Sequence, residues 1–259
     1  MFKRISLSLA VILILTLTLS LISLAAEVPE TFDQALSLDA KVESGELPPV
    51  EDRVSEEPYV VEPIDEIGQY GGTLTTTTLR ADDYGDDTML HSWPNLVKSN
   101  AGGSDFEPNL ARDWEISEDA TTYTFYLRKG LKWSDGHPFT ADDIMFWYED
   151  YLQNEQLMPV IGPPWRTEKG LVEITKIDDY TVEFKFPVPR PFFLNRLVHM
   201  GAWNLIFPKH YMKQFHPAYR PLEEIEKEAQ EAGFDEWYQY FNEKNSNIWG
   251  QSSRVGRPT

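Results

Sequence analysis

The stretch PNLARDWEISEDATTYTFYLRKGLKWSDGHPFTADDIMFWYEDY, residues 108–151, carries the strongest secondary-structure signals in the chain. Apolar and polar residues alternate over 114–117 and again over most of 123–128, and a period of two is typical of β-strands. Between these runs, residues 118–121 supply short polar side chains that favour a turn. The stretch therefore predicts a β-hairpin.

A helix is predicted after the hairpin, beyond a polar loop that Gly130 and Gly136 interrupt. Thr140 can cap its N-terminus together with Asp143, which is a capping-box arrangement, and acidic side chains suit the positive end of a helix. The apolar side chains that follow at helical spacing are Ile144, Trp147, Tyr148 and Tyr151. These features indicate a scaffold of mixed α/β class, with no residue that must act as a nucleophile, base or metal ligand.

Further elements are expected on both sides of this core. Upstream, we expect a short surface helix over 31–44, an acidic Pro-rich lead-in over 45–72 that lies extended over the core, a Thr-rich strand over 73–80 and a helix over 86–91. Downstream, we expect a hairpin over 171–186, a short helix around 192–198, a strand over 204–207 and helices over 210–215, 222–232 and 234–242.

Several ordered motifs resemble family 5 of the extracellular solute-binding proteins, the peptide- and oligosaccharide-binding subunits of ABC importers. They are the N-L-A-x-x-W run at 109–114, the TYTFYLRKG strand at 122–130, the WSDG turn at 133–136 and the helix led by FTADD at 139–143. The likeness continues through YGGTL at 70–74 and FPKHY at 207–211, so it covers most of residues 70–212.

The resemblance implies a mixed α/β lobe like that of the type II periplasmic binding proteins, which are two-lobed clamshells. It implies a monomeric receptor without enzymatic activity, with an oligopeptide or oligosaccharide ligand and an ABC permease of the inner membrane as partner. Family members are substantially longer, so we interpret the sequence as a fragment that stops after the N-terminal lobe. Its expected parts are a signal peptide at 1–26, the N-terminal helix and lead-in at 27–72 and an incomplete lobe at 73–259. Alone, this fragment is expected to bind the ligand more weakly than the complete protein.

The first 26 residues have the three parts of a secretory signal. Lys3 and Arg4 precede a long apolar run, and SLAA at 23–26 offers small residues to a signal peptidase, with cleavage expected near Ala25 or Ala26. The alternative is an uncleaved membrane anchor, because about 20 apolar residues span a bilayer. The apolar run is rich in hydroxyl side chains and ends in small residues, which favours a cleaved signal peptide and hence a periplasmic or extracellular protein.

Composition excludes several classes of function. The chain has 42 acidic and 23 basic residues and a net charge of −19, which disfavours nucleic-acid partners and anionic membrane surfaces. It has no cysteine, which excludes disulfides, thiolate metal sites and a lipid-anchored lipoprotein. Hydrophobic residues make up 41% of the chain, as in a globular protein.

No metal or catalytic motif is present. There is no P-loop, no Rossmann glycine pattern, no G-x-S-x-G elbow and no HExxH spacing. The acidic loop at 80–87 pairs its acids instead of alternating them as an EF-hand does, so a solvated loop or helix cap is favoured over a calcium site. We therefore expect no cofactor and no metal. The five histidines, interpreted as core or surface residues, are His91, His137, His199, His210 and His216.

Candidate ligand contacts come from the tryptophans and from loop positions that the family resemblance implies. Indole rings stack on sugars or enclose apolar side chains, and Trp93 and Trp203 lie outside the strong core periodicities. In the family, the ligand lies between lobes, against loops at the ends of the first lobe's strands. The matching residues are Asp83 and Tyr84 for polar contacts, Trp93 and Trp203 as stacking walls, and Asn204. By contrast, Trp114, Trp133 and Trp147 fit the scaffold pattern and are expected in the core.

Two functions from different classes remain. The first is a receptor that delivers its ligand unchanged to a permease; the second is an exported carbohydrate-active enzyme that uses paired carboxylates. Paired acids are common in any acidic chain, and a glycosidase needs two carboxyls about 5–9 Å apart across a cleft. The family resemblance and the missing catalytic motifs favour the receptor. The resemblance gives oligopeptides as the first ligand class and oligosaccharides as the second.

Overall fold

The computed structural model describes residues 31–61, 63, 66–73, 75, 95–100, 102–200 and 205–248. The expected signal peptide, nearly all of the expected strand at 73–80, the acidic loop at 80–87 and the expected helix at 86–91 lie outside these residues. Within the described part of the chain, no helix has the length and apolar character needed to span a bilayer.

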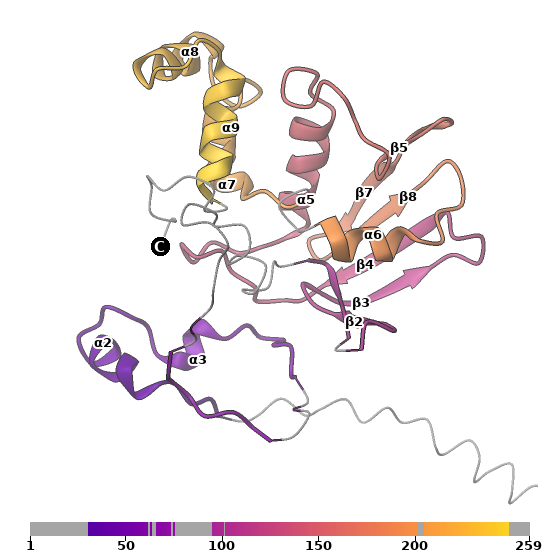
Figure 1. Ribbon diagram of the computed structural model, residues 1–259. Helices are drawn as coiled ribbons and strands as arrows, with labels where there is room; N and C mark the ends of the chain where they lie inside the picture. The colour runs from indigo at the N-terminus through magenta and orange to yellow at the C-terminus, as the bar shows by residue number, and fades with distance from the viewer. Residues whose placement is uncertain are drawn as a thin grey trace, which may run out of the picture.

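A four-stranded antiparallel sheet forms one layer of the fold (Figure 1). β3 (Ala111–Ile116) and β4 (Thr122–Leu127) make the first predicted hairpin, and β7 (Glu173–Asp178) and β8 (Thr181–Lys185) make the second. The two hairpins join through β4 and β8, so the strand order is β3-β4-β8-β7. Both hairpin predictions are confirmed, and the mixed α/β class with them.

One face of the sheet carries the hydrophobic core. The alternation in β4 places Tyr123, Phe125 and Leu127 on this face, each at most 1% exposed. Val182 and Phe184 of β8 lie on the same face, because they are the register partners of Phe125 and Tyr123. Full burial of a large apolar side chain is worth about 1.5–3 kcal/mol, so this face is a major source of stability.

The predicted capping box is present at the start of α5 (Ala141–Phe146). Thr140 Oγ1 accepts the N–H of Asp142, and the Asp143 carboxylate accepts the Thr140 N–H at 3.0 Å. Burial raises the pKa of the Asp143 carboxyl, although three N–H donors oppose that change. The reciprocal bonds satisfy donors that the first helical turn leaves open.

The continuation of this helix differs from the prediction, because residues Trp147–Leu152 form the π-helix η2. In an α-helix, Trp147 and Leu152 are about 140° apart around the axis, on different faces. The wider winding of a π-helix turns them toward the same side. Both side chains are 1% exposed, so the π-turn allows both to enter the core.

Short strands and a helix complete the sheet layer. α6 (Phe193–Met200) contacts β1 (Val97–Ser99), which pairs with β2 (Phe106–Pro108). A small hairpin joins β5 (Arg166–Thr167) to β6 (Gly170–Leu171). Neither of these two-stranded sheets was predicted, because two or three residues are too few to display a period.

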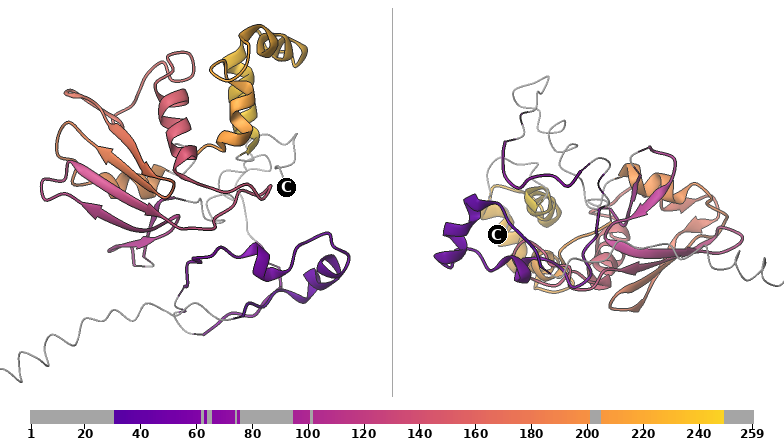
Figure 2. Two further views of the ribbon diagram at one scale, coloured as in Figure 1. Left: turned by 180° about the vertical axis from the view of Figure 1, so that it is seen from behind. Right: turned by 90° about the horizontal axis from the view of Figure 1, so that it is seen from below.

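Three C-terminal helices pack beyond α5. They are α7 (Lys209–Met212), which continues into the 3₁₀ helix η4 (Lys213–Phe215), then α8 (Leu222–Glu231) and α9 (Trp237–Ile248). α5 contacts β7 on one side and α7 on the other, and α7 contacts α9. The layers therefore run from the sheet through α5 to the C-terminal helices, as Figures 1 and 2 show.

The strand predicted at 204–207 is wrong for its described part. Leu205, Ile206 and Phe207 are buried, but they form no strand. The Phe207 N–H bonds the Asp143 carbonyl at 3.5 Å, and its ring packs 4.7 Å from the ring of Tyr151. An apolar run of this length indicates burial without determining whether its neighbour is a strand or a helix.

The N-terminal part is a lead-in with short helical turns. η1 (Leu36–Leu38) and α2 (Asp39–Glu43) occupy the region of the predicted surface helix. α3 (Val50–Arg53) interrupts the lead-in, where only an extended chain was expected. Pro49 is its N-cap, and a proline there costs little because the first helical turn has no partner for the missing N–H. After α3, the carbonyls of Glu57 and Pro58 accept hydrogen bonds from Arg128 at the end of β4.

Candidate functional site

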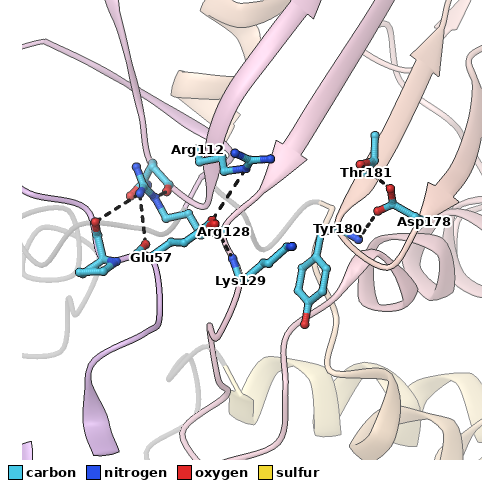
Figure 3. Close-up of polar contacts among 9 residues, drawn as sticks. Glu57, Arg112, Arg128, Lys129, Asp178, Tyr180 and Thr181 are labelled. Atoms are coloured by element: carbon cyan, nitrogen blue, oxygen red, sulfur yellow. Dashed lines mark hydrogen bonds and ion pairs between the residues drawn. The ribbon is translucent and has the colours of Figure 1, made fainter. Parts of the chain in front are cut away.

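Arg128 is a buried cation at the end of β4, where the lead-in meets the sheet (Figure 3). Arg128 is 9% exposed, and its Nε donates to the Asn109 carbonyl at 2.6 Å. Its Nη1 donates to the carbonyls of Glu57 and Pro58 at 3.2 and 3.4 Å. Burial lowers the pKa of the guanidinium, and the Glu57 carboxylate opposes that change. A desolvated cation needs such acceptors, so Arg128 ties two chain segments together.

Glu57 supplies a carboxylate to the same place. Its Oε2 accepts the Lys129 N–H at 3.3 Å and lies 3.8 Å from Arg112 Nε (Figure 3). The side chains of Arg112 and Glu57 are 50% and 37% exposed, so this ion pair contributes at most about 1 kcal/mol. The buried hydrogen bonds of Arg128 therefore hold the lead-in more strongly than this surface pair does.

Tyr59 extends the contact onto the β1–β2 pair. Its hydroxyl donates to Glu107 Oε2 at 2.9 Å. Lys98, the register partner of Glu107, places Nζ 3.4 Å from the Glu107 carboxylate and 4.2 Å from the centroid of the Tyr59 ring. The Arg128 guanidinium lies 5.2 Å from the same centroid. The ring thus contacts two cations, an arrangement that its negative π-face favours. We call this set the Arg128 corner: Glu57, Pro58, Tyr59, Lys98, Glu107, Asn109 and Arg128.

Asn95 is the next described residue along the chain after Thr75, and it joins this same region. Its carbonyl accepts the Leu110 N–H at 3.1 Å, and the Leu110 carbonyl accepts the Arg128 N–H at 3.0 Å. Its side-chain Nδ2 donates to the Val198 carbonyl of α6 at 3.2 Å. Asn95 is 7% exposed, and its Oδ1 is buried with no hydrogen-bond partner among the residues that the structure describes. The lead-in, β1 and α6 therefore meet at one end of the sheet.

The turn between β7 and β8 closes the same end (Figure 3). The Tyr180 carbonyl accepts the N–H of Leu127, the residue before Arg128, at 2.7 Å. Lys129 Nζ lies 5.9 Å from the centroid of the Tyr180 ring. Asp178 accepts the Tyr180 N–H at 2.7 Å and the Thr181 hydroxyl at 3.0 Å. The Tyr180 N–H bond is the main cause that lowers the pKa of the Asp178 carboxyl.

All five residues predicted to contact ligand lie outside the described part of the chain: Asp83, Tyr84, Trp93, Trp203 and Asn204. Two described residues, Asn95 and Val198, are hydrogen-bonded to each other. Of the three tryptophans expected in the core, Trp147 is buried there at 1% exposure, whereas Trp114 and Trp133 are partly buried and pack against the core.

The polar contacts of His210 lie apart from the Arg128 corner. His210 Nε2 is 2.6 Å from Asp135 Oδ2, and the rings of His137 and His210 stack at 3.9 Å. These contacts join the WSDG turn to α7. Over the described residues, no three His, Cys, Asp or Glu side chains are arranged to hold a metal ion.

Comparison with known proteins points to one family. The model of bacterial extracellular solute-binding proteins, family 5, matches residues 105–241. The periplasmic alpha-galactoside-binding protein of Rhizobium meliloti (strain 1021) is 33% identical over 69% of this chain and 28% of its own length. The dipeptide-binding protein of Escherichia coli (strain K12) is 36% identical over 42% of this chain and 23% of its own.

Two solved structures share the fold. An oligopeptide-binding protein OppA superposes with a TM-score of 0.74 and 40% identity over 83% of this chain. The periplasmic binding protein MelB of Agrobacterium fabrum C58, in complex with stachyose, superposes with a TM-score of 0.60 and 26% identity over 84% of this chain. The chain covers 33% and 34% of these two proteins. Its fold is that of a lobe of a type II periplasmic binding protein.

Proposed function

Because the chain belongs to family 5 of the bacterial extracellular solute-binding proteins, we propose that it serves as the substrate receptor of an ABC importer. The observation that carries this proposal is the family match over 105–241, which includes the whole four-stranded sheet and most of the C-terminal helices. Proteins of this family are transport components and not enzymes, which favours the receptor over the carbohydrate-active enzyme. The partners in this proposal are a small oligomeric ligand and a membrane permease, and the receptor acts as a monomer.

Two ligand classes are supported by named relatives. The dipeptide-binding protein and OppA point to peptides, and the alpha-galactoside-binding protein and MelB with stachyose point to oligosaccharides. We place oligopeptides first and oligosaccharides second. In either case a receptor gains affinity by removing its ligand from water against apolar walls, with a few polar groups that fix orientation.

A thermal-shift screen tests the function and separates the two classes. The purified protein is heated with a panel of di- to hexapeptides and, separately, with alpha-galactosyl and cello-oligosaccharides. A ligand present at 100 times its Kd adds about 2.7 kcal/mol to the free energy of unfolding, so one class should raise the Tm by several degrees. Mass spectrometry should recover that ligand unchanged. No shift with either class, or a hydrolysed ligand, would contradict the receptor.

For the ligand contacts, we retain Asp83 and Tyr84 as polar partners, Trp93 and Trp203 as stacking walls, and Asn204 beside them. Aromatic anchors dominate binding energies, and their truncation to alanine costs about 1–3 kcal/mol each. Calorimetry with the ligand from the screen checks this proposal on Tyr84→Ala and Trp203→Ala. An affinity equal to that of the unmodified protein removes the residue from the site.

Proteins of this family work in the periplasm or outside the cell. We propose that this chain reaches that location through a signal peptide cleaved near Ala25 or Ala26, so that the mature protein begins with the N-terminal helix and lead-in. The charged, apolar and small-residue segments of 1–26 support the proposal. N-terminal sequencing of the exported protein should find Ala26 or Glu27 first. An intact Met1 in the membrane fraction would indicate an anchor instead.

A further inference from the structure

His216, directly after η4, is a histidine enclosed by aromatic rings. It is 4% exposed. The centroid of its imidazole lies 5.2 Å from that of Trp237 and 5.8 Å from that of Phe241, both in α9. The rings of Phe146 in α5 and of Tyr219 lie at 6.2 and 6.1 Å. Because these rings exclude water, a charge on the imidazole would lose most of its solvation.

Both ring nitrogens of His216 face N–H groups. Nδ1 accepts the backbone N–H of Ala218 at 3.2 Å, and Nε2 lies 3.3 Å from Asn154 Nδ2. The Asn154 amide is held in this orientation because its Oδ1 accepts the N–H groups of Gln156 and Leu157 at 3.0 and 3.2 Å. A neutral imidazole can accept from one of two such donors at a time, whereas an imidazolium accepts from neither. Protonation therefore places two N–H groups against each other.

Asp150 of η2 is the charged group among the described residues that acts on this imidazole. Burial lowers the pKa of His216, and the carboxylate and a backbone hydrogen bond of Asp150 oppose that change without reversing it. The same carboxylate accepts the Tyr219 hydroxyl at 2.7 Å, and burial raises the pKa of that phenol, which therefore stays neutral. The side chains that α5 and α9 place against the ring carry no charge.

The attachment of α9 depends on the same aromatic cluster. Of the α9 side chains that the structure describes, Trp237 and Phe241 are buried, at 2% and 0% exposure, and both contact the His216 ring. Trp237 Nε1 also donates to Gln156 Oε1 at 3.1 Å. The helix contacts α7, η4 and α8 and lies away from the sheet (Figure 1). Water that reaches a protonated imidazole must therefore enter where α9 packs.

We propose that His216 is an acid-sensitive latch, whose neutral imidazole holds α9 in place and whose protonation releases the helix while the sheet stays folded. An exposed histidine titrates near pH 6.5. Because the folded state lowers the pKa of His216, the stabilisation is fully present above about pH 6.5 and is lost as the pH falls toward the folded value. Within that window, each pH unit raises the released population by up to about tenfold.

Amide hydrogen exchange of the full protein at about pH 7.5 and about pH 5 tests the latch, with rates corrected for the intrinsic effect of pH on exchange. We expect the protection of 237–245 to fall at least about threefold at the lower pH, while that of β4 stays unchanged. His216→Asn keeps an acceptor for the Ala218 N–H but cannot be protonated, so it should protect 237–245 equally at the two pH values. The same substitution at the exposed His137 is the matched control and should retain the loss.

A direct titration keeps the test decisive if His216→Asn does not fold. In proton NMR, the imidazole resonance of His216, assigned through its contact with Trp237, should titrate below about pH 6.5. Asp150→Asn keeps an acceptor for the Tyr219 hydroxyl and removes the charge, so it should move this titration to still lower pH. A titration at or above pH 6.5 would overturn the latch. So would an acid loss of protection that is equal in β4 and α9, or equal in the unmodified protein and His216→Asn.

Discussion

Replacing Asp143 by alanine is expected to lower the free energy of unfolding by about 4 kcal/mol, because three part-buried donors lose their buried acceptor at about 1–3 kcal/mol each. Asp143 is 3% exposed. Its Oδ2 accepts the Thr140 N–H at 3.0 Å and the Trp133 Nε1–H at 3.3 Å, and its Oδ1 accepts the Lys209 N–H at 2.9 Å. One carboxylate therefore joins the WSDG turn, α5 and α7.

The neighbouring acid supplies the matched control. The Asp142 side chain is 49% exposed and pairs with Lys176 Nζ at 3.1 Å, and Lys176 has a second partner in Asp179 at 2.7 Å. Asp142→Ala should cost less than about 1 kcal/mol, because exposed ion pairs contribute little. Urea unfolding followed by circular dichroism measures both variants. Similar losses for the two would show that the three bonds to Asp143 do not matter as argued.

The double role of Asp143 marks the limit of what sequence patterns predict. The capping box is visible in the sequence because its two partners are three residues apart and local geometry determines the contact. The bond to Lys209 joins residues far apart in the chain, and only the packing of α7 against α5 creates it. In the same way, strand periodicity predicts the two hairpins, but not that β4 and β8 pair to make them one sheet.

The Arg128 corner was missed for a related reason. The TYTFYLRKG motif placed Arg128 at the end of a strand, yet its acceptors are backbone carbonyls, and carbonyls carry no residue-specific signal. The one feature of the sequence that indicates a buried Arg128 is its position directly after Leu127, a core residue of β4. The ligand residues, by contrast, came from family resemblance, because loop positions have no periodicity from which a contact could be inferred.

The pair Phe192 and Phe193 shows a third limit. The helix predicted around 192–198 includes both, but two adjacent side chains point in different directions from a helix, so only one of them can face the centre of the core. In the structure Phe192 is 74% exposed and Phe193 is 1% exposed. Phe193 begins α6, and its ring is the centre of an aromatic cluster. Its centroid distances are 4.7 Å to Phe186, 5.0 Å to Tyr123, and 5.9 Å to both Trp165 and Phe184.

Phe193→Ala is therefore expected to lower the free energy of unfolding by about 3–5 kcal/mol, the range for a large aromatic removed from a close-packed core. Phe192→Ala should stay within about 0.5 kcal/mol of the unmodified protein, as exposed substitutions do. Urea unfolding measures the free energy of unfolding of the two variants, which remove the same type of side chain at adjacent positions. Because α6 also carries the Val198 carbonyl that holds Asn95, Phe193→Ala should raise amide exchange over 95–99 as well. Equal stability losses for the two phenylalanines would contradict the position of α6 on the sheet.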